Sequence, residues 1–321
     1  MAPRACGRGG RRNSEVVGGS MIARGFERAA SACTVRCLIR IGPVSISRKC
    51  TMLSLMDILH RNNVIVRGSR DETIVFAHGF GCDSNMWRHV APAFEERYRI
   101  VLFDNVGAGK SDLSAYSFDK YRTLDGYAGD LVEIIDALAI GKAIFVGHSV
   151  SAMIGLIAAR QRPDLFRSLV MVGPSPCYVD GDGYVGGFSQ EQLEELLEFL
   201  DSNHLGWSGQ MAPVIMGNPD RPELGKELTE SFCRTDPEIT RHFAKATFLS
   251  DCRDLLKDFE IPTLILQCSS DVIAPIEVGE YVHRQLPNSK LVILKATGHC
   301  PNLSAPEETI AAIEAYLGQA A

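Results

Sequence analysis

The stretch IFVGHSVSAMIG, residues 144–155, decides the fold. It opens with an apolar run typical of a buried strand and continues directly into a helix-forming segment. Gly147 and Ser151 lie two residues before and after Ser149, where a sharp strand-to-helix turn leaves room only for small side chains. The pattern predicts a nucleophile elbow that exposes Ser149 above the sheet, although Ser151 replaces the second glycine of Gly-x-Ser-x-Gly. The alternative is a serine in an ordinary strand-to-helix turn.

Around this elbow, short apolar strands alternate with amphipathic helices. The near-continuous apolar strands favour burial on both faces, and hence an α/β fold with a mainly parallel sheet flanked by helices. Strands are expected at residues 64–68, 73–79, 98–104, 142–149, 167–174, 262–268 and 290–295. Helices are expected at residues 123–140, 151–163, 275–287 and 306–318.

The alternation breaks between about residues 176 and 252. Ser189 and Gln192 form a capping box at the start of one helix, and residues 237–250 have the apolar spacing of another. We therefore expect three or four helices to be inserted here as a lid over the carboxyl edge of the sheet.

The partners of a nucleophilic serine follow it as an acid and then a histidine. Asp271 lies just past one predicted strand, and His299 lies just past the next. His299 would remove the proton of Ser149, and Asp271 would orient the imidazole. The rival acids precede their strand instead of following it: Asp251, Asp254 and Asp258.

An oxyanion hole needs two backbone N–H groups near the nucleophile. Val150 follows Ser149 and supplies the first. The segment His-Gly-Phe-Gly at residues 78–81 follows an early strand, and we expect the second from Phe80.

Composition limits the other function classes. The chain of 321 residues has a net charge of −6, yet residues 1–52 carry +8, so the remainder carries −14. An acidic body argues against nucleic acid as a partner, and no apolar run is long enough to cross a membrane. Ten scattered cysteines without Cys-x-x-Cys favour reduced thiols in the cytoplasm. The histidines and carboxylates lack ligand spacing, so no metal and no cofactor are expected.

Residues 1–52 are rich in arginine and are expected to be disordered, with the folded α/β domain at residues 53–321. Three interpretations remain open for this extension. It is an organelle transit peptide, a basic tail for an anionic partner, or an upstream addition from a misassigned start codon.

The segment DNVGAGKS, residues 104–111, resembles a phosphate-binding loop only at its end. Gly-x-x-x-x-Gly-Lys-Ser would require glycine at position 104, where the chain has Asp104, and a carboxylate there would repel phosphate. We predict a structural turn in which Asp104 accepts turn N–H groups and Gly107 and Gly109 supply the bends.

From about residue 57 onward the chain resembles the α/β-hydrolase superfamily. Within it, the chain is similar to the RsbQ-like stress-signalling hydrolases and to the plant karrikin and strigolactone receptors, which share the elbow GHSVSAMIG. The resemblance is carried by HGFGCDSNMW, LFDNVGAGKSDL, TLDGYAGDL, FVGHSVSAMIG, VMVGPSPCYV, GGFSQEQL, FCRTDPEI, LQCSSDVIAP and GHCPNLSAPEET.

The resemblance implies a lid of four helices over an apolar pocket, although Met211 departs from the aromatic residue of the karrikin receptors. For Trp207 and Phe188, packing between lid and core is an equal alternative. The implied pocket residues are Phe80, Tyr178, Phe188, Trp207 and Phe248.

Two function hypotheses follow. The first is a serine hydrolase that cleaves a small apolar ester or lactone through an acyl-serine intermediate. The second is a ligand-sensing receptor in which hydrolysis is secondary. For RsbQ-like proteins, the resemblance implies a PAS-domain phosphatase as partner and activation of a sigma-factor stress response.

Overall fold

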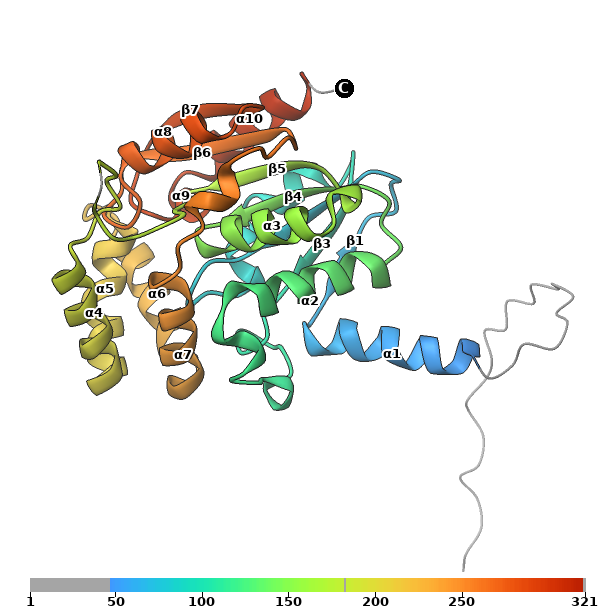
Figure 1. The fold of residues 1–321 in the computed structure, drawn as a ribbon, viewed down its shortest axis with the longest axis horizontal. Helices are drawn as coiled ribbons and strands as arrows, with labels where there is room; N and C mark the ends of the chain where they lie inside the picture. Colours follow the sequence, from blue (N-terminus) through green and yellow to red (C-terminus); the bar gives the residue numbers. More distant parts are fainter. Residues whose placement is uncertain (1–46, 182, 320–321) are drawn as a thin grey trace, which may run out of the picture. The chain divides into compact units, whose positions relative to one another are not determined.

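The computed structural model describes residues 47–181 and 183–319, with side chains from residue 54 (Figure 1). Its sheet has the strand order β1-β3-β2-β4-β5-β6-β7, and only the β1–β3 pair is antiparallel. The predicted α/β architecture with a mainly parallel sheet is therefore confirmed. The strands are β1 (Ile65–Arg67), β2 (Thr73–Ala77), β3 (Arg99–Phe103), β4 (Ala143–His148), β5 (Phe166–Val172), β6 (Thr263–Ser270) and β7 (Ser289–Thr297).

Both faces of the sheet are covered. On one face, Val75 and Phe145 pack with α2 (Leu124–Ala137), α3 (Val150–Gln161) and α8 (Ile276–Gln285). A Cβ on Gly155 would lie 2.2 Å from the Phe145 ring, so glycine lets α3 lie directly on β4.

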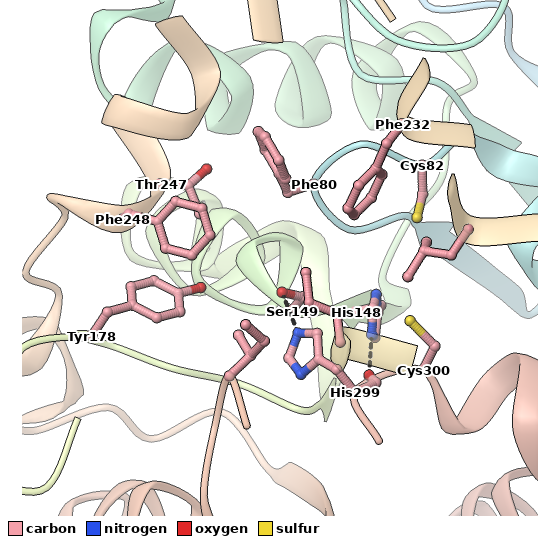
Figure 2. A pocket seen from close by; sticks show the side chains of 13 residues that line it. Phe80, Cys82, His148, Ser149, Tyr178, Phe232, Thr247, Phe248, His299 and Cys300 are labelled. Carbon is pink, nitrogen blue, oxygen red and sulfur yellow. Dashed lines mark hydrogen bonds between the residues drawn. The ribbon is translucent and has the colours of Figure 1, made fainter. Parts of the chain in front are cut away.

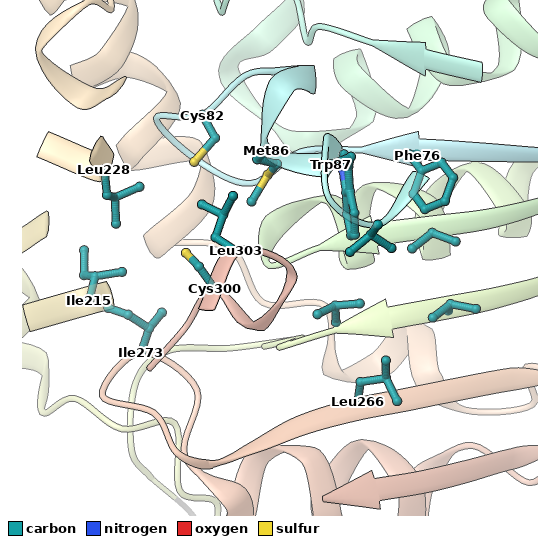
Figure 3. Packing of buried hydrophobic residues seen from close by; sticks show 14 of the residues in the cluster. Phe76, Cys82, Met86, Trp87, Ile215, Leu228, Leu266, Ile273, Cys300 and Leu303 are labelled. Atoms are coloured by element: carbon teal, nitrogen blue, oxygen red, sulfur yellow. The ribbon is translucent and has the colours of Figure 1, made fainter. Parts of the chain in front are cut away.

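On the other face, Phe76 and Leu266 pack with Trp87 and with α10 (Pro306–Leu317) (Figure 3). The short helices η1 (Ser84–Trp87), η2 (Ala91–Phe94) and α9 (Pro301–Ser304) also contribute to this layer. Every residue of β2 and β4 is buried, as the apolar runs predicted.

The helix α1 (Ser47–Arg61) was not predicted, and it begins before the expected domain start at residue 53. Its weak amphipathic pattern explains why the sequence did not indicate it. Arg61 at its end forms ion pairs with Asp130 and Glu133 of α2. The predictions for residues 1–46 lie outside the described residues. None of the described helices is both long and apolar enough to cross a membrane.

The insertion between β5 and β6 contains α4 (Gln190–Ser202), α5 (His204–Met216), α6 (Pro222–Cys233) and α7 (Pro237–Phe248). Figure 1 shows these helices grouped at one end of the sheet. The predicted capping box is present, because Ser189 and Gln192 each accept the backbone N–H of the other. We refer to residues 176–252 as the helical insertion.

The loop at residues 104–111 is a structural turn, as predicted. Asp104 accepts the N–H groups of Lys110 and Ser84 at 2.9 and 2.8 Å. Gly107 and Gly109 have φ values of 98° and 56°, which favour glycine. Only the three-residue helix η3 (Leu113–Ala115) follows, so no long helix begins here.

Candidate active site

Ser149 lies at the turn between β4 and α3, with φ 56° and ψ −126°. A residue with a side chain rarely adopts this backbone conformation. The Ser149 N–H donates to the carbonyl of Val172 on the neighbouring strand at 2.8 Å. A Cβ on Gly147 would lie 2.6 Å from the Ser151 carbonyl oxygen, so only glycine fits there. The predicted elbow is therefore the observed local structure.

Ser149, His299 and Asp271 form a continuous hydrogen-bonded chain. The His299 ring lies 2.8 Å through Nε2 from Ser149 Oγ and 2.6 Å through Nδ1 from Asp271 Oδ2. Because an ionised carboxylate only accepts, Nδ1 carries the hydrogen and Nε2 is free to accept the serine proton. Figure 2 shows the serine and histidine side chains turned toward each other. All three residues are buried, so their hydrogen bonds are sheltered from water.

Asp271 is held by its own loop. Its Oδ1 accepts the backbone N–H groups of Ile273 and Ala274 at 2.8 and 3.2 Å, which leaves Oδ2 for His299. The rival acids Asp251, Asp254 and Asp258 are exposed. The position of an acid after its strand, rather than before it, therefore selected the residue that contacts His299.

The loop that carries His299 is joined to the helical insertion. The His299 N–H donates to the Ile215 carbonyl at the end of α5 at 2.8 Å. Asn218 Nδ2 donates to the carbonyls of Met216 and Thr297, both at 2.9 Å. Gly298 approaches the Met216 carbonyl so closely that a Cβ would lie 1.8 Å from it. The insertion therefore supports the histidine directly.

The two predicted oxyanion donors belong to segments next to Ser149. Val150 is the first residue of α3, and Phe80 lies in the loop after β2. A Cβ on Gly79 would lie 3.2 Å from Ser149 Cβ, which places this loop directly against the nucleophile. Within residues 47–181 and 183–319, neither the Phe80 nor the Val150 amide has a hydrogen-bond partner, so both are available to a ligand.

A small cavity lies above Ser149 (Figure 2). Three of the predicted pocket residues line it: Phe80, Tyr178 and Phe248. The Tyr178 hydroxyl points toward Ser149, and burial raises the pKa of this phenol, so it stays protonated. The further lining residues are Cys82, His148, Ile215, Leu228, Phe232, Thr247, Ile273 and Cys300.

Two predicted pocket residues do not line the cavity. Trp207 is fully buried behind it, stacked on Phe232 with ring centroids 5.4 Å apart. Phe188 is held at the edge of the insertion, where its backbone pairs with Tyr178 and Asp180. Packing between insertion and core, the alternative for both residues, is the observed arrangement. Met211 likewise packs against the core and does not line the cavity.

Sequence reasoning missed the two cavity thiols and Phe232. Cys82 directly follows the predicted oxyanion loop, and Cys300 directly follows His299. Their positions next to predicted site residues could have indicated that both thiols line the cavity. Burial raises the pKa of Cys82 to about 12 and that of Cys300 well above its ordinary value. Both are therefore neutral, weakly polar wall residues. Phe232 lies on α6, and its contact with Phe80 depends on how that helix packs against the core. No local sequence pattern indicates this packing.

His148, directly before the nucleophile, is buried beside His299. Its Nε2 donates to the His299 carbonyl at 2.7 Å, and its Nδ1 is buried without a hydrogen-bond partner among the described residues. Burial, reinforced by the neighbouring His299, lowers the pKa of His148 to about 3. His148 is therefore neutral at physiological pH.

This buried imidazole predicts a pH dependence of stability. Below the ordinary histidine pKa of about 6.5, His148 becomes protonated in the unfolded chain. In the native state it stays neutral down to about pH 3. The free energy of unfolding should therefore fall with decreasing pH, by up to about 1.4 kcal/mol per pH unit from this group. Urea denaturation from pH 7 to 4.5 should show a shallower fall for His148→Gln. The exposed control His283→Gln should follow the wild type, and equal slopes for all three proteins would contradict the assignment.

Comparison with known proteins gives consistent matches. A sequence family described as the alpha/beta hydrolase fold matches residues 72–306. Karrikin insensitive 2 receptor CA from Petunia hybrida is 40% identical over 250 residues, which are 78% of this chain and 93% of that protein. Strigolactone esterase D14 from Arabidopsis thaliana is 38% identical over 257 residues, 80% of this chain and 96% of that protein.

Among solved structures, a hydrolase from Oleispira antarctica superposes with a TM-score of 0.80 at 41% identity. The superposition covers 82% of this chain and 97% of that chain. The sheet topology, the elbow at Ser149 and these matches together show that the chain belongs to the alpha/beta hydrolase family.

Proposed function

We propose that the protein is a serine hydrolase that cleaves a small, mostly apolar ester or lactone through an acyl-serine intermediate. The observation that carries the proposal is the hydrogen-bonded chain from Ser149 through His299 to Asp271. Two unpartnered backbone amides beside the serine support it, because they would accept the negative charge of a tetrahedral intermediate. The similarity to proteins named as esterases gives further support.

The reaction would proceed in two steps. His299 Nε2 takes the hydroxyl proton while Ser149 Oγ bonds to the substrate carbonyl carbon, and the Phe80 and Val150 amides bind the resulting oxyanion. The imidazolium then protonates the leaving alkoxide as the ester bond breaks. In the second step, His299 activates water, which attacks the acyl group and releases the acid with Ser149 restored. Asp271 remains ionised and stabilises the imidazolium.

The cavity wall supports the substrate class. Its lining is dominated by aromatic and aliphatic side chains, as is usual for sites that bind small apolar ligands. Thr247 Oγ1 is buried without a partner among the described residues, and Thr247 lines the cavity. An ester or lactone oxygen on an apolar frame would accept a hydrogen bond from this hydroxyl.

Removal of the nucleophile tests this reaction. Ser149→Ala should lower the turnover of p-nitrophenyl butyrate by at least about 10³-fold, with the circular dichroism spectrum unchanged. Asp271→Asn should also lose most of the activity, because it changes the histidine tautomer. Asp251→Asn is the matched control, since this acid is exposed and paired with Arg253. Turnover by Ser149→Ala near the wild-type rate would overturn the proposal.

A second candidate function is ligand sensing, with hydrolysis secondary. The helices of the insertion line the cavity with Ile215, Leu228 and Phe248, and the insertion also joins the His299 loop. Ligand binding and the outer surface of the insertion are therefore connected through the same helices. The similarity to proteins named as receptors supports this candidate.

The outer surface of α4 favours a basic partner. It exposes an acidic row at helical spacing: Glu191, Glu194, Glu195 and Glu198. Such a row would attract a complementary positive face. From the resemblance to RsbQ-like proteins, we propose a PAS-domain phosphatase as this partner, in a cytoplasmic stress-signalling pathway.

Charge reversal on α4 separates the two roles. Glu194→Lys with Glu198→Lys should weaken calorimetric binding to a purified PAS-domain phosphatase by at least about tenfold, because like charges then face each other. Ester turnover should stay within twofold of the wild type. Glu260→Lys, which reverses an exposed charge before β6, should leave binding unchanged. Equal binding by all variants would contradict the proposed surface.

A further inference from the structure

Ser151 stands where the usual elbow motif has glycine, and its hydroxyl group makes a hydrogen bond. It is fully buried at the second position of α3. Its Oγ donates to the His78 carbonyl at 2.5 Å, across 73 positions of sequence. Glycine at this position would offer no such group. The departure therefore adds a direct bond between the start of α3 and the loop after β2.

The His78 side chain fixes the same loop from the other side. Its Nε2 accepts the Asn105 N–H at 2.9 Å, so its Nδ1 carries the hydrogen and donates to the Gly79 carbonyl at 2.8 Å. The ring is fully buried. Asn105 belongs to the turn at residues 104–111, which Asp104 holds through backbone N–H groups. The segment that resembled a phosphate-binding loop thus supports the loop beside the nucleophile.

These bonds determine how the Phe80 amide is oriented. The Gly79 carbonyl and the Phe80 N–H belong to one planar peptide unit and point in opposite directions. A donor that holds the carbonyl therefore also fixes the direction of the N–H. The other proposed oxyanion donor, the Val150 amide, is adjacent in sequence to Ser151.

We infer that Ser151 is a positioning residue, which sets the spacing between the Phe80 and Val150 amides by tying His78 to α3. The inference rests on the proposed hydrolase function and assigns Ser151 no contact with substrate. Charge stabilisation by backbone donors depends on their fixed placement before the reaction. A loop released from α3 would have to reorder as the oxyanion forms.

The expected effect is on the transition state rather than on substrate binding. Removal of an oxyanion donor lowers kcat by about 10²–10³-fold. A donor that is retained but less well placed should lose less, so we expect Ser151→Ala to lower kcat by about tenfold, with KM within twofold. The affinity for a boronic acid, which forms a tetrahedral adduct on serine, should fall in parallel with kcat/KM.

The experiment compares full-length wild type, Ser151→Ala, Ser151→Gly and Ser208→Ala. Ser208 is the matched control, because it is fully buried and its Oγ donates to the His204 carbonyl at 2.8 Å, away from the cavity lining. Turnover of p-nitrophenyl butyrate, inhibition by butylboronic acid and urea denaturation are measured for each protein. Both Ser151 variants should show the parallel loss, and Ser208→Ala should not, even if it is equally destabilised.

Two outcomes would overturn the inference. One is a Ser151→Ala protein with kcat and boronic acid affinity within twofold of the wild type. The other is an equal loss of kcat in Ser208→Ala, which would indicate general destabilisation. Ser149→Ala measured alongside separates the two proposals. If that variant is active, the hydrolase function fails; if it is inactive while Ser151→Ala is unaffected, only the role of Ser151 fails.

Discussion

The backbone at Ser149 is the constraint on which the site depends. A non-glycine residue at φ 56° and ψ −126° costs about 1–3 kcal/mol, and the surrounding structure must hold it in place. The buried strand β4, the hydrogen bond to Val172 and the start of α3 provide that support. The same turn requires glycine at 147 and a small residue at 151. Because the conformation lifts the side chain out of the sheet, Ser149 Oγ lies 2.8 Å from His299 Nε2.

Much of the site was predictable because parallel strands end at a common edge. Asp271 directly follows β6 and His299 follows β7 after one glycine, so strand assignment alone brought both residues near Ser149. The position of an acid after its strand, rather than before it, then distinguished Asp271 from Asp251 and its neighbours. Strands can be assigned from local sequence, because they appear as near-continuous apolar runs or as apolar residues at every second position. The turn at residues 104–111 was assigned on similarly local grounds, from one carboxylate where a phosphate-binding loop needs glycine.

The walls of the cavity were less predictable, because they depend on how helices of the insertion pack. Phe188 and Trp207 are aromatic residues in the expected segment, yet Trp207 packs on the cavity-lining rings of Phe80 and Phe232 and does not line the cavity itself. Such lateral contacts join residues distant in sequence and leave no periodic signal. Helix α1 was not predicted for a different reason, because its apolar residues do not form a clear amphipathic stripe. The support of the oxyanion loop by Ser151 and His78 likewise depends on tertiary hydrogen bonds.

The central claim is that Ser149 is a nucleophile activated by His299. Mass spectrometry after treatment with a fluorophosphonate tests it most directly, because that reagent modifies activated serines. Trypsin cleavage after Lys142 and Arg160 releases residues 143–160, which contain both Ser149 and Ser151. We predict a single adduct that fragment ions assign to Ser149, with labelling lost in His299→Ala. An adduct on another residue, or labelling of Ser149 that is unchanged in His299→Ala, would contradict the account.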